Sequence, residues 1–270
     1  MKKTIIIIAL LALVAFPVFA KKGNKITIAG STTVLPIAQA TAEIFMDQNP
    51  DINISVRGGG SSVGIASIMA GTVDIGDASR HIKAKELTAA RESGINPYEN
   101  VVANDGIAMV VHKNNMVKNL TIQQIKDIFT GKISNWKEVG GPSLPIVVIS
   151  RDVSSGTFEV FNSLVLSGST QIDGALMLAS NNAVVSTVAS TPGAIGYAGL
   201  GYLNNTVNDV KVNNIKATKQ TVQNKSYPIA RTLHMYTNGA PKGVVKQYID
   251  FILSAEGQKI VEEQGFISVK

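Results

Sequence analysis

Three short segments concentrate serine, threonine and glycine where a predicted strand gives way to a predicted helix. Residues 30–33 read Gly-Ser-Thr-Thr, residues 60–62 read Gly-Ser-Ser, and residues 154–157 read Ser-Ser-Gly-Thr. A helix N-terminus offers unpaired backbone N–H groups and the positive end of its dipole. Glycine lets the backbone approach closely, and the hydroxyl groups add further donors. Each segment is therefore suited to holding an anion.

Each segment taken alone also has a purely structural interpretation. A serine or threonine before a helix is most often an N-cap, and a glycine there most often forms a turn. Three such segments in one chain favour a binding site, and an arginine accompanies two of them. Arg80 follows the end of a predicted strand, and Arg151 begins the third segment. A guanidinium can grip an oxyanion through two parallel hydrogen bonds, although a solvated charge or a structural ion pair is the alternative for either arginine.

The elements that must position these segments alternate between strands and helices. The apolar spacing predicts strands at 25–29, 52–56, 73–75, 106–111, 146–149, 195–197 and 227–236. It predicts helices at 34–47, 63–70, 121–129, 158–166, 244–253 and 255–263. This alternation indicates an α/β fold with a mainly parallel sheet covered on both faces. In such sheets ligands bind at the carboxyl ends of the strands, where the three segments lie.

The first twenty residues read as a cleaved secretory signal. Lys2 and Lys3 precede an apolar run from Ile5 to Phe16, and small residues end the stretch. The run is shorter than the roughly 20 residues that span a bilayer. The chain contains no cysteine, which excludes a lipoprotein anchor at the cleavage point. We therefore expect a mature periplasmic protein, and we expect it to be a monomer.

Composition and spacing argue against several other classes of protein. The 25 basic and 19 acidic residues are interspersed, without an arginine-rich run, so we expect no nucleic-acid partner. The three histidines, His81, His112 and His234, lie far apart in the sequence and match no metal-ligand spacing. The third segment is not a Gly-x-Ser-x-Gly nucleophile elbow, and no P-loop lysine pattern occurs. We therefore expect no catalytic residues, no cofactor and no metal.

The motifs, read in order, resemble the phosphate-binding component of Pst-type phosphate ABC importers. The resemblance runs from about residue 26 to residue 266, and the ordered set is far more specific than any one motif. The segments that carry it are 30–34, 58–64, 74–80, 128–141, 151–157 and 191–197.

The resemblance implies a type II periplasmic binding protein fold, in which hinge strands join two α/β lobes with mixed sheets and the ligand lies in the interlobe cleft. Lobe I would comprise residues 21–108 and 226–270, and lobe II residues 109–225. The protein would bind inorganic phosphate and deliver it to the permease subunits in the membrane. Carried over by position, the phosphate-binding residues would be Thr32, Thr33, Ser61, Ser79, Arg80, Arg151, Ser155, Gly156 and Thr157.

Two positions depart from the family pattern, and one is Ser79, which aligns with an acid that the family carries near the end of the third strand. Some members carry an aspartate two residues after the arginine of the third segment, where this chain has Val153. A buried carboxylate can accept the proton that phosphate carries and sulfate lacks. Asp77, Asp105 and Asp152 are the candidate substitutes. Binding of another oxyanion (sulfate, molybdate or tungstate) therefore stays open, as does a phosphate-binding surface or adhesion protein without a transporter.

Overall fold

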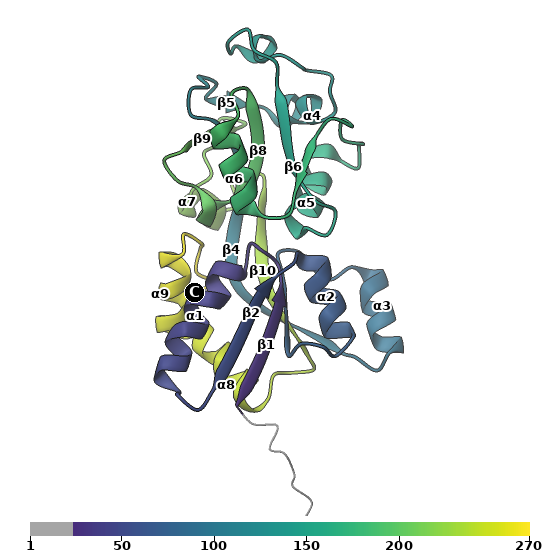
Figure 1. Cartoon of the computed structure of the whole chain (residues 1–270), viewed down its shortest axis with the longest axis vertical. Helices are drawn as coiled ribbons and strands as arrows, with labels where there is room; N and C mark the ends of the chain where they lie inside the picture. Colours follow the sequence, from purple (N-terminus) through teal and green to yellow (C-terminus); the bar gives the residue numbers. More distant parts are fainter. Residues whose placement is uncertain (1–23) are drawn as a thin grey trace, which may run out of the picture.

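The computed structural model describes residues 24–270, which form two α/β lobes stacked along the long axis of the molecule (Figure 1). The predicted signal lies outside the described residues. None of the helices within 24–270 is long and apolar enough to cross a membrane. The expected architecture of two lobes with mixed sheets is confirmed.

The first lobe, at the bottom of Figure 1, is built on parallel strands in the order β2-β1-β3. Their bounds are Lys25–Gly30 for β1, Asn53–Gly58 for β2 and Ile75–Ala78 for β3. Strand β10 (Ala230–Asn238) runs antiparallel to β3 and next to β4 (Pro97–His112). Alternating side chains of β1 face opposite layers, so Ile28 packs towards α1 (Leu35–Gln48) and α8 (Gly243–Ile252) while Ala29 packs towards α2 (Ser61–Met69). Helices α3 (Ala84–Glu92) and α9 (Ala255–Glu263) complete the lobe.

The second lobe is built on the other end of β4. There β4 pairs with β8 (Ala194–Gly199) and β9 (Val207–Val212), while β6 (Val147–Arg151) lies parallel to β8 and to β7 (Leu176–Leu178). A short β5 (Asn119–Leu120) pairs with β9. The helical elements are α4 (Ile122–Phe129), η1 (Trp136–Val139), α5 (Gly156–Phe161), the π-helical η2 (Asn162–Leu166), α6 (Asn181–Ser190), η3 (Leu200–Tyr202) and α7 (Lys219–Gln223).

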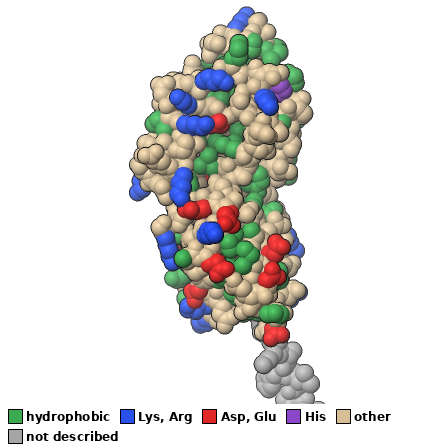
Figure 2. Space-filling model, turned by 90° about the vertical axis from the view of Figure 1, so that its left-hand side faces the viewer, with side chains coloured by type: hydrophobic (Ala, Val, Ile, Leu, Met, Phe, Trp, Pro, Cys, Tyr) green, Lys and Arg blue, Asp and Glu red, His purple; other side chains and the backbone are tan. Residues whose placement is uncertain are grey.

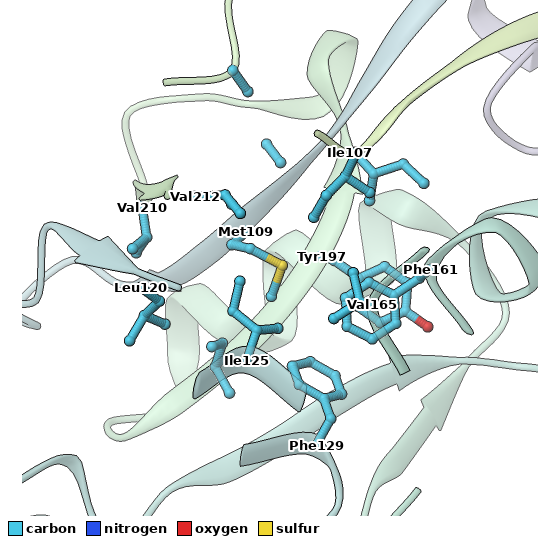
Figure 3. Close-up of a cluster of buried hydrophobic side chains, with 14 of the residues drawn as sticks. Ile107, Met109, Leu120, Ile125, Phe129, Phe161, Val165, Tyr197, Val210 and Val212 are labelled. Atoms are coloured by element: carbon cyan, nitrogen blue, oxygen red, sulfur yellow. The ribbon is translucent and has the colours of Figure 1, made fainter. Parts of the chain in front are cut away.

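The largest buried cluster lies in this second lobe and ties α5 to β8 (Figure 3). The rings of Phe161 and Tyr197 stack with centroids 4.0 Å apart, and Phe129 lies 4.7 Å from Phe161. Aromatic pairs at these distances contribute about 0.5–1.5 kcal/mol beyond their buried area. The cluster therefore fixes the third Ser/Thr/Gly segment, which immediately precedes and begins α5.

Strand β4 belongs to the sheets of both lobes. It pairs with β10 from Pro97 to Gly106 and with β8 from Ile107 onwards. The chain returns to the first lobe along β10, which carries a register irregularity between Leu233 and His234. Two strands therefore cross between the lobes, side by side in Figure 1.

Figure 2 shows how charge is distributed over one face of the molecule. Basic side chains predominate on the part that belongs to the second lobe, and acidic side chains gather near the waist and on the first lobe.

Most expected elements are present, with informative shifts. The third strand begins at Ile75 rather than at 73. Just before it, the backbone N–H and the hydroxyl of Thr27 in β1 donate to the carboxylate of Asp74, so a side chain makes the contact with β1 at this position. Strand β4 starts nine residues before the expected 106, since β10 pairs with its polar first half. Helices α3 and α6 were not expected from the apolar spacing.

Candidate functional site

The first segment places two threonines in the space between the lobes. Ser31 Oγ accepts hydrogen bonds from the backbone N–H groups of Thr33 (3.1 Å) and Val34 (3.4 Å), so Ser31 closes the turn before α1. Thr32 and Thr33 are thereby left to face the second lobe. Thr32 Oγ1 accepts a hydrogen bond from Arg151 (3.2 Å), and Thr33 Oγ1 lies 3.1 Å from Thr157 Oγ1.

The second segment brings Ser61 to the same place. Gly60 precedes α2 with a φ of 93°, a conformation that favours glycine, and no side chain caps this helix. The N-cap interpretation is therefore wrong for this segment. Ser61 Oγ accepts a hydrogen bond from the backbone of Ser79 (2.9 Å) and lies 3.2 Å from Ser79 Oγ. Both serines are buried.

The third segment contains one true cap. Ser155 Oγ accepts hydrogen bonds from the backbone N–H groups of Thr157 (3.1 Å) and Phe158 (3.3 Å), so the N-cap interpretation holds here. Gly156 touches the opposite lobe. A Cβ atom added there would lie 2.3 Å from Ser61 Oγ and 2.7 Å from Ser79 Oγ. The first turn of α5 is therefore packed against the hydroxyl groups of the first lobe.

Main-chain atoms also join the lobes at this point. The backbone N–H of Ser62 donates to the carbonyl of Ser154 across the cleft (3.0 Å). The Ser154 hydroxyl donates to the carbonyl of Gly59 (3.3 Å), and the Tyr202 hydroxyl donates to the carbonyl of Thr32. The lobes are therefore in direct contact around the three segments.

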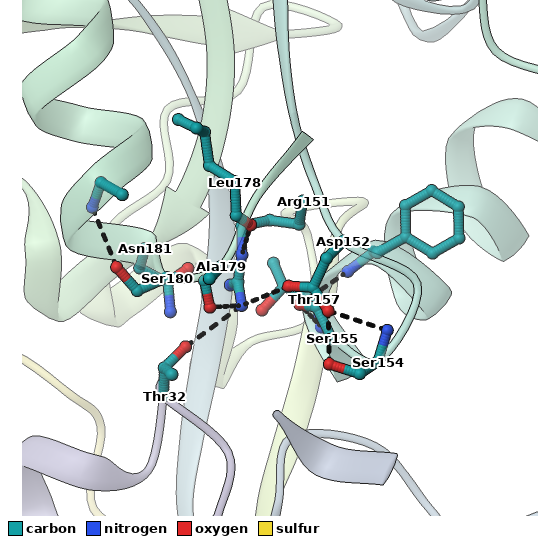
Figure 4. Close-up of polar contacts among 12 residues, drawn as sticks. Thr32, Arg151, Asp152, Ser154, Ser155, Thr157, Leu178, Ala179, Ser180 and Asn181 are labelled. Atoms are coloured by element: carbon teal, nitrogen blue, oxygen red, sulfur yellow. Dashed lines mark hydrogen bonds and ion pairs between the residues drawn. The ribbon is translucent and has the colours of Figure 1, made fainter. Parts of the chain in front are cut away.

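Of the two arginines that the sequence analysis named as candidate ligands, Arg151 is the more deeply buried. Its Nε and Nη2 donate to the carbonyls of Leu178 and Ala179, each at 3.0 Å, and Nη2 also reaches Thr32 (Figure 4). Its Nη1 is buried without a hydrogen-bond partner in the described chain, and its side chain is 1% exposed. Burial lowers the pKa of the Arg151 guanidinium. The carboxylate of Asp152, 3.7 Å away, opposes this shift and offsets part of the free energy of burying the charge. A buried cation with an uncommitted N–H group suits an anionic ligand.

The structure does not bring Arg80 to this cluster. Its guanidinium donates to both carboxylate oxygens of Glu86 at 2.9 Å and to the hydroxyl of Ser62 at 3.1 Å. Its Nε lies 3.1 Å from Glu159 of the second lobe, close enough for an ion pair but not aligned as a hydrogen bond. Two carboxylates therefore hold Arg80 beside the cleft as a link between the lobes.

Arg231 was missed by the sequence reasoning and lies within the cluster. Nε and Nη2 donate to Asp105 Oδ2 at 3.0 and 2.8 Å, while Nη1 reaches Thr157 Oγ1 (3.0 Å) and Nη2 reaches Thr33 Oγ1 (3.2 Å). The sequence feature that could have indicated Arg231 is a single arginine within a stretch that has the apolar pattern of a strand. Arg231 thus braces a threonine from each lobe, with its charge matched by Asp105.

Asn181 was missed as well, because α6 was not expected. Its Nδ2 donates to Thr33 Oγ1 (2.9 Å) and its side chain is fully buried. The available signal was Ser180, which caps α6 by accepting from Ala183 N, followed by apolar residues at helical spacing.

The three candidate proton acceptors occupy different surroundings. Asp105 is fully buried; burial raises its pKa, and the Arg231 guanidinium opposes that shift. Asp152 Oδ1 accepts from the backbone of Ser154 (2.9 Å) and from its hydroxyl. Asp77 is buried, its Oδ1 has no partner within residues 24–270, and burial raises its pKa well above the usual range.

The assembled cluster is rich in hydrogen-bond donors. Arg231 is paired closely with Asp105 at 2.8 Å, whereas Arg151 has, among the described residues, only the more distant Asp152 at 3.7 Å and keeps an uncommitted N–H group. Hydroxyl groups from both lobes converge on the same place, together with the first turns of α2 and α5. Such an arrangement can bind an oxyanion on all sides. The residues brought together are Thr32, Thr33, Ser61, Ser79, Arg151, Ser155, Gly156 and Thr157.

Comparison with known proteins identifies the family of this chain. Residues 18–256 match the family model described as PBP superfamily domain. The phosphate-binding protein PstS of Bacillus subtilis is 37% identical over 251 residues, covering 92% of this chain and 82% of the relative. The PstS of Borreliella burgdorferi is 34% identical, with all of both chains covered.

A solved structure shares the whole fold. The putative phosphate ABC transporter substrate-binding protein of Clostridium perfringens, determined with bound phosphate, is 41% identical and superposes with a TM-score of 0.85. The match covers 92% of this chain and all of that one. The type II binding protein fold is thereby confirmed, and this chain belongs to the PstS family of phosphate-binding proteins.

Proposed function

We propose that this protein binds inorganic phosphate between its lobes and delivers it to the permease of an ABC importer. The observation that carries the proposal is the convergence of hydroxyl groups from both lobes around the buried Arg151. Thr32, Ser61 and Ser79 come from the first lobe, and Thr157 comes from the second. Because neither set alone surrounds a tetrahedral anion, the ligand must be gripped by both.

The proposed phosphate ligands are the eight converging residues, with Arg231 and Asn181 as supports. Arg231 and Asn181 both donate to Thr33 Oγ1, and Arg231 also donates to Thr157. These donors orient the two threonine hydroxyls so that their protons are directed away from Arg231 and Asn181. Arg80 acts through its ion pairs with Glu86 and Glu159 rather than through the ligand.

Closure of the lobes is the proposed mechanism. We place lobe I at 21–108 and 226–270 and lobe II at 109–225, with the hinge where β4 and β10 cross. The change of partner along β4 at Gly106 supports this position. Contacts that both lobes make with one ligand make the closed state depend on binding. The closed shape would then be what the permease recognises.

The relatives are named as binding proteins, which fits a carrier without catalytic activity. We further propose that the mature protein works in the periplasm, after cleavage of residues 1–20. The apolar run and basic start of that segment support export.

Calorimetry on phosphate-stripped protein tests the proposal. The donors and the buried cation should give a dissociation constant below about 10 μM, or roughly −7 kcal/mol. Parallel titrations with sulfate and molybdate distinguish phosphate from other oxyanions. Absence of heat and of a thermal shift at millimolar phosphate would exclude phosphate as the ligand, and tighter binding of sulfate or molybdate would assign the site to that anion.

A further inference from the structure

A second polar cluster lies on the first lobe, outside the proposed anion site. It contains His81, Glu99 and His234, contributed by the loop after β3, by β4 and by β10. The strand register brings these residues together. His234 pairs with Ala78 of β3, three residues before His81, and with Val101 of β4, two residues after Glu99. The spacing of the histidines in the sequence gave no sign of this contact, because it does not reveal which strands are neighbours.

The three potential ligand atoms are spaced as in a metal site. Glu99 Oε1 lies 2.9 Å from His81 Nδ1 and 3.1 Å from His234 Nδ1, and all three atoms lie within 4.8 Å of one another. Ligands about 2.0–2.1 Å from a tetrahedral zinc ion stand roughly 3.3 Å apart. Only small side-chain adjustments are therefore needed to surround an ion.

The second observation is the state of His234. Its side chain is fully buried, and its Nδ1 has no hydrogen-bond partner in the described part of the chain although Glu99 Oε1 is 3.1 Å away. Two atoms at this distance that do not point at each other can both point at a common third position. Metal ligands are arranged in this way. His81 Nδ1, by contrast, is hydrogen-bonded to Glu99 Oε1, and a bound ion would replace that bond.

Outer contacts hold the ligands in place. His234 Nε2 lies 2.9 Å from Thr232 Oγ1, and when Nε2 donates to that oxygen the lone pair resides on Nδ1. The Tyr236 hydroxyl donates to Glu99 Oε1 at 2.5 Å. Such second partners fix the tautomer and orientation of metal ligands.

Access and local charge are also compatible with a cation. His81 is 71% exposed, and both histidines line a groove of about 880 Å³. Two arginines line the same groove, and both are paired with carboxylates: Arg80 with Glu86 and Glu159, and Arg231 with Asp105.

We propose that His81 Nδ1, Glu99 Oε1 and His234 Nδ1 bind a divalent transition metal ion such as Zn²⁺. Two imidazoles and one carboxylate suit zinc and cobalt rather than calcium or magnesium, which prefer oxygen ligands. The exposed side of the cluster leaves room for water at the remaining coordination position. All three ligands come from the first lobe, so the ion would bind without crossing the cleft.

Zinc titration of metal-free protein without a polyhistidine tag, in phosphate-free buffer, tests the site. We expect one Zn²⁺ per chain, and Co²⁺ should give the visible absorption of a four- or five-coordinate ion. His81→Ala should weaken binding at least about 100-fold, because loss of even an outer partner of a metal ligand costs about 10–100-fold. Thr232→Val should weaken it about tenfold through the lost outer contact.

The matched control is His112→Ala. His112 lies at the far end of β4, where its Nδ1 accepts from the backbone of Asn114 (3.2 Å), and its loss should leave zinc binding unchanged. Glu99→Gln keeps the shape of the side chain and serves as a second variant if another fails to fold. Equal zinc affinity in the unmodified protein, His81→Ala and Glu99→Gln would overturn the proposal. So would the absence of zinc binding at about 100 μM.

Discussion

A single methyl group at Gly156 should keep the lobes from closing around the ligand. In Gly156→Ala the new carbon would stand 2.3 Å from Ser61 Oγ and 2.7 Å from Ser79 Oγ. Ordinary carbon–oxygen contacts begin above about 3.2 Å, so the lobes must separate by about 1 Å or both hydroxyls must rotate away. Either response would remove the proposed contacts between the anion and the first lobe.

The expected loss follows from the number of contacts removed. A hydrogen bond to a charged group contributes about 1.5–3 kcal/mol, so losing those of two serines costs at least about 3 kcal/mol, or roughly 100-fold in phosphate affinity. The clash involves the opposite lobe, and Gly156 does not have a positive φ. The unliganded variant should therefore unfold at the same temperature as the unmodified protein.

Calorimetry measures the affinity, and small-angle X-ray scattering measures the change in radius of gyration on adding phosphate. Gly174→Ala is the matched control, because an added Cβ there meets nothing within 4 Å and its φ is not positive. If Gly156→Ala bound phosphate as tightly as Gly174→Ala, the two lobes would not share the ligand at this point, and the reasoning would be refuted.

Four further changes test other parts of the structure. Arg151→Ala should lose at least about 2 kcal/mol of phosphate binding with the fold intact, by calorimetry; an unchanged affinity would make Arg151 a structural cation. Arg80→Ala should lose less than about tenfold, since its partners are carboxylates; a loss as large as that of Arg151→Ala would place it on the ligand. Thr157→Val should reduce both affinity and closure in scattering, and a loss of affinity with full closure would contradict the shared grip. Burial raises the pKa of the Asp77 carboxyl in the folded protein above its pKa in the unfolded chain. The contribution of Asp77 to the free energy of unfolding is therefore greatest below the unfolded-state pKa, and it falls by up to about 1.4 kcal/mol per pH unit between the unfolded-state and folded-state pKa values. Asp77→Asn should remove this fall in urea unfolding between pH 4 and 8; parallel curves for both proteins would show that the carboxyl is not responsible.

The sequence indicated the candidate site through local signals. Serine, threonine and glycine at the start of helices mark Ser61, Ser155 and Thr157 because helix termini leave N–H groups unpaired within the helix itself. A buried ion pair leaves no such mark. Arg80 and Arg231 are both arginines near strand ends, and only tertiary contacts decide that one joins Glu86 and the other Asp105.

The features that the sequence did not predict depend on pairing between strands that are distant in the chain. The first half of β4 contains Asn100, Asn104 and Asp105, and a polar strand of this kind is recognised only when its partner is known. The same register brings His81 beside His234, with ring centroids 4.6 Å apart. Periodicity along the chain carries no information about either contact.

The bond from Ser62 N–H to the Ser154 carbonyl has a consequence for how this sequence can evolve. Main-chain atoms make the bond, so nearly any amino acid other than proline at position 62, and any at position 154, can supply it. Selection for closure of the lobes would instead act on Gly60. A Cβ atom there would lie 2.8 Å from the Ser154 carbonyl oxygen, and the φ of 93° favours glycine. Homologues can therefore keep this bond while the residues at positions 62 and 154 vary, whereas position 60 should remain glycine.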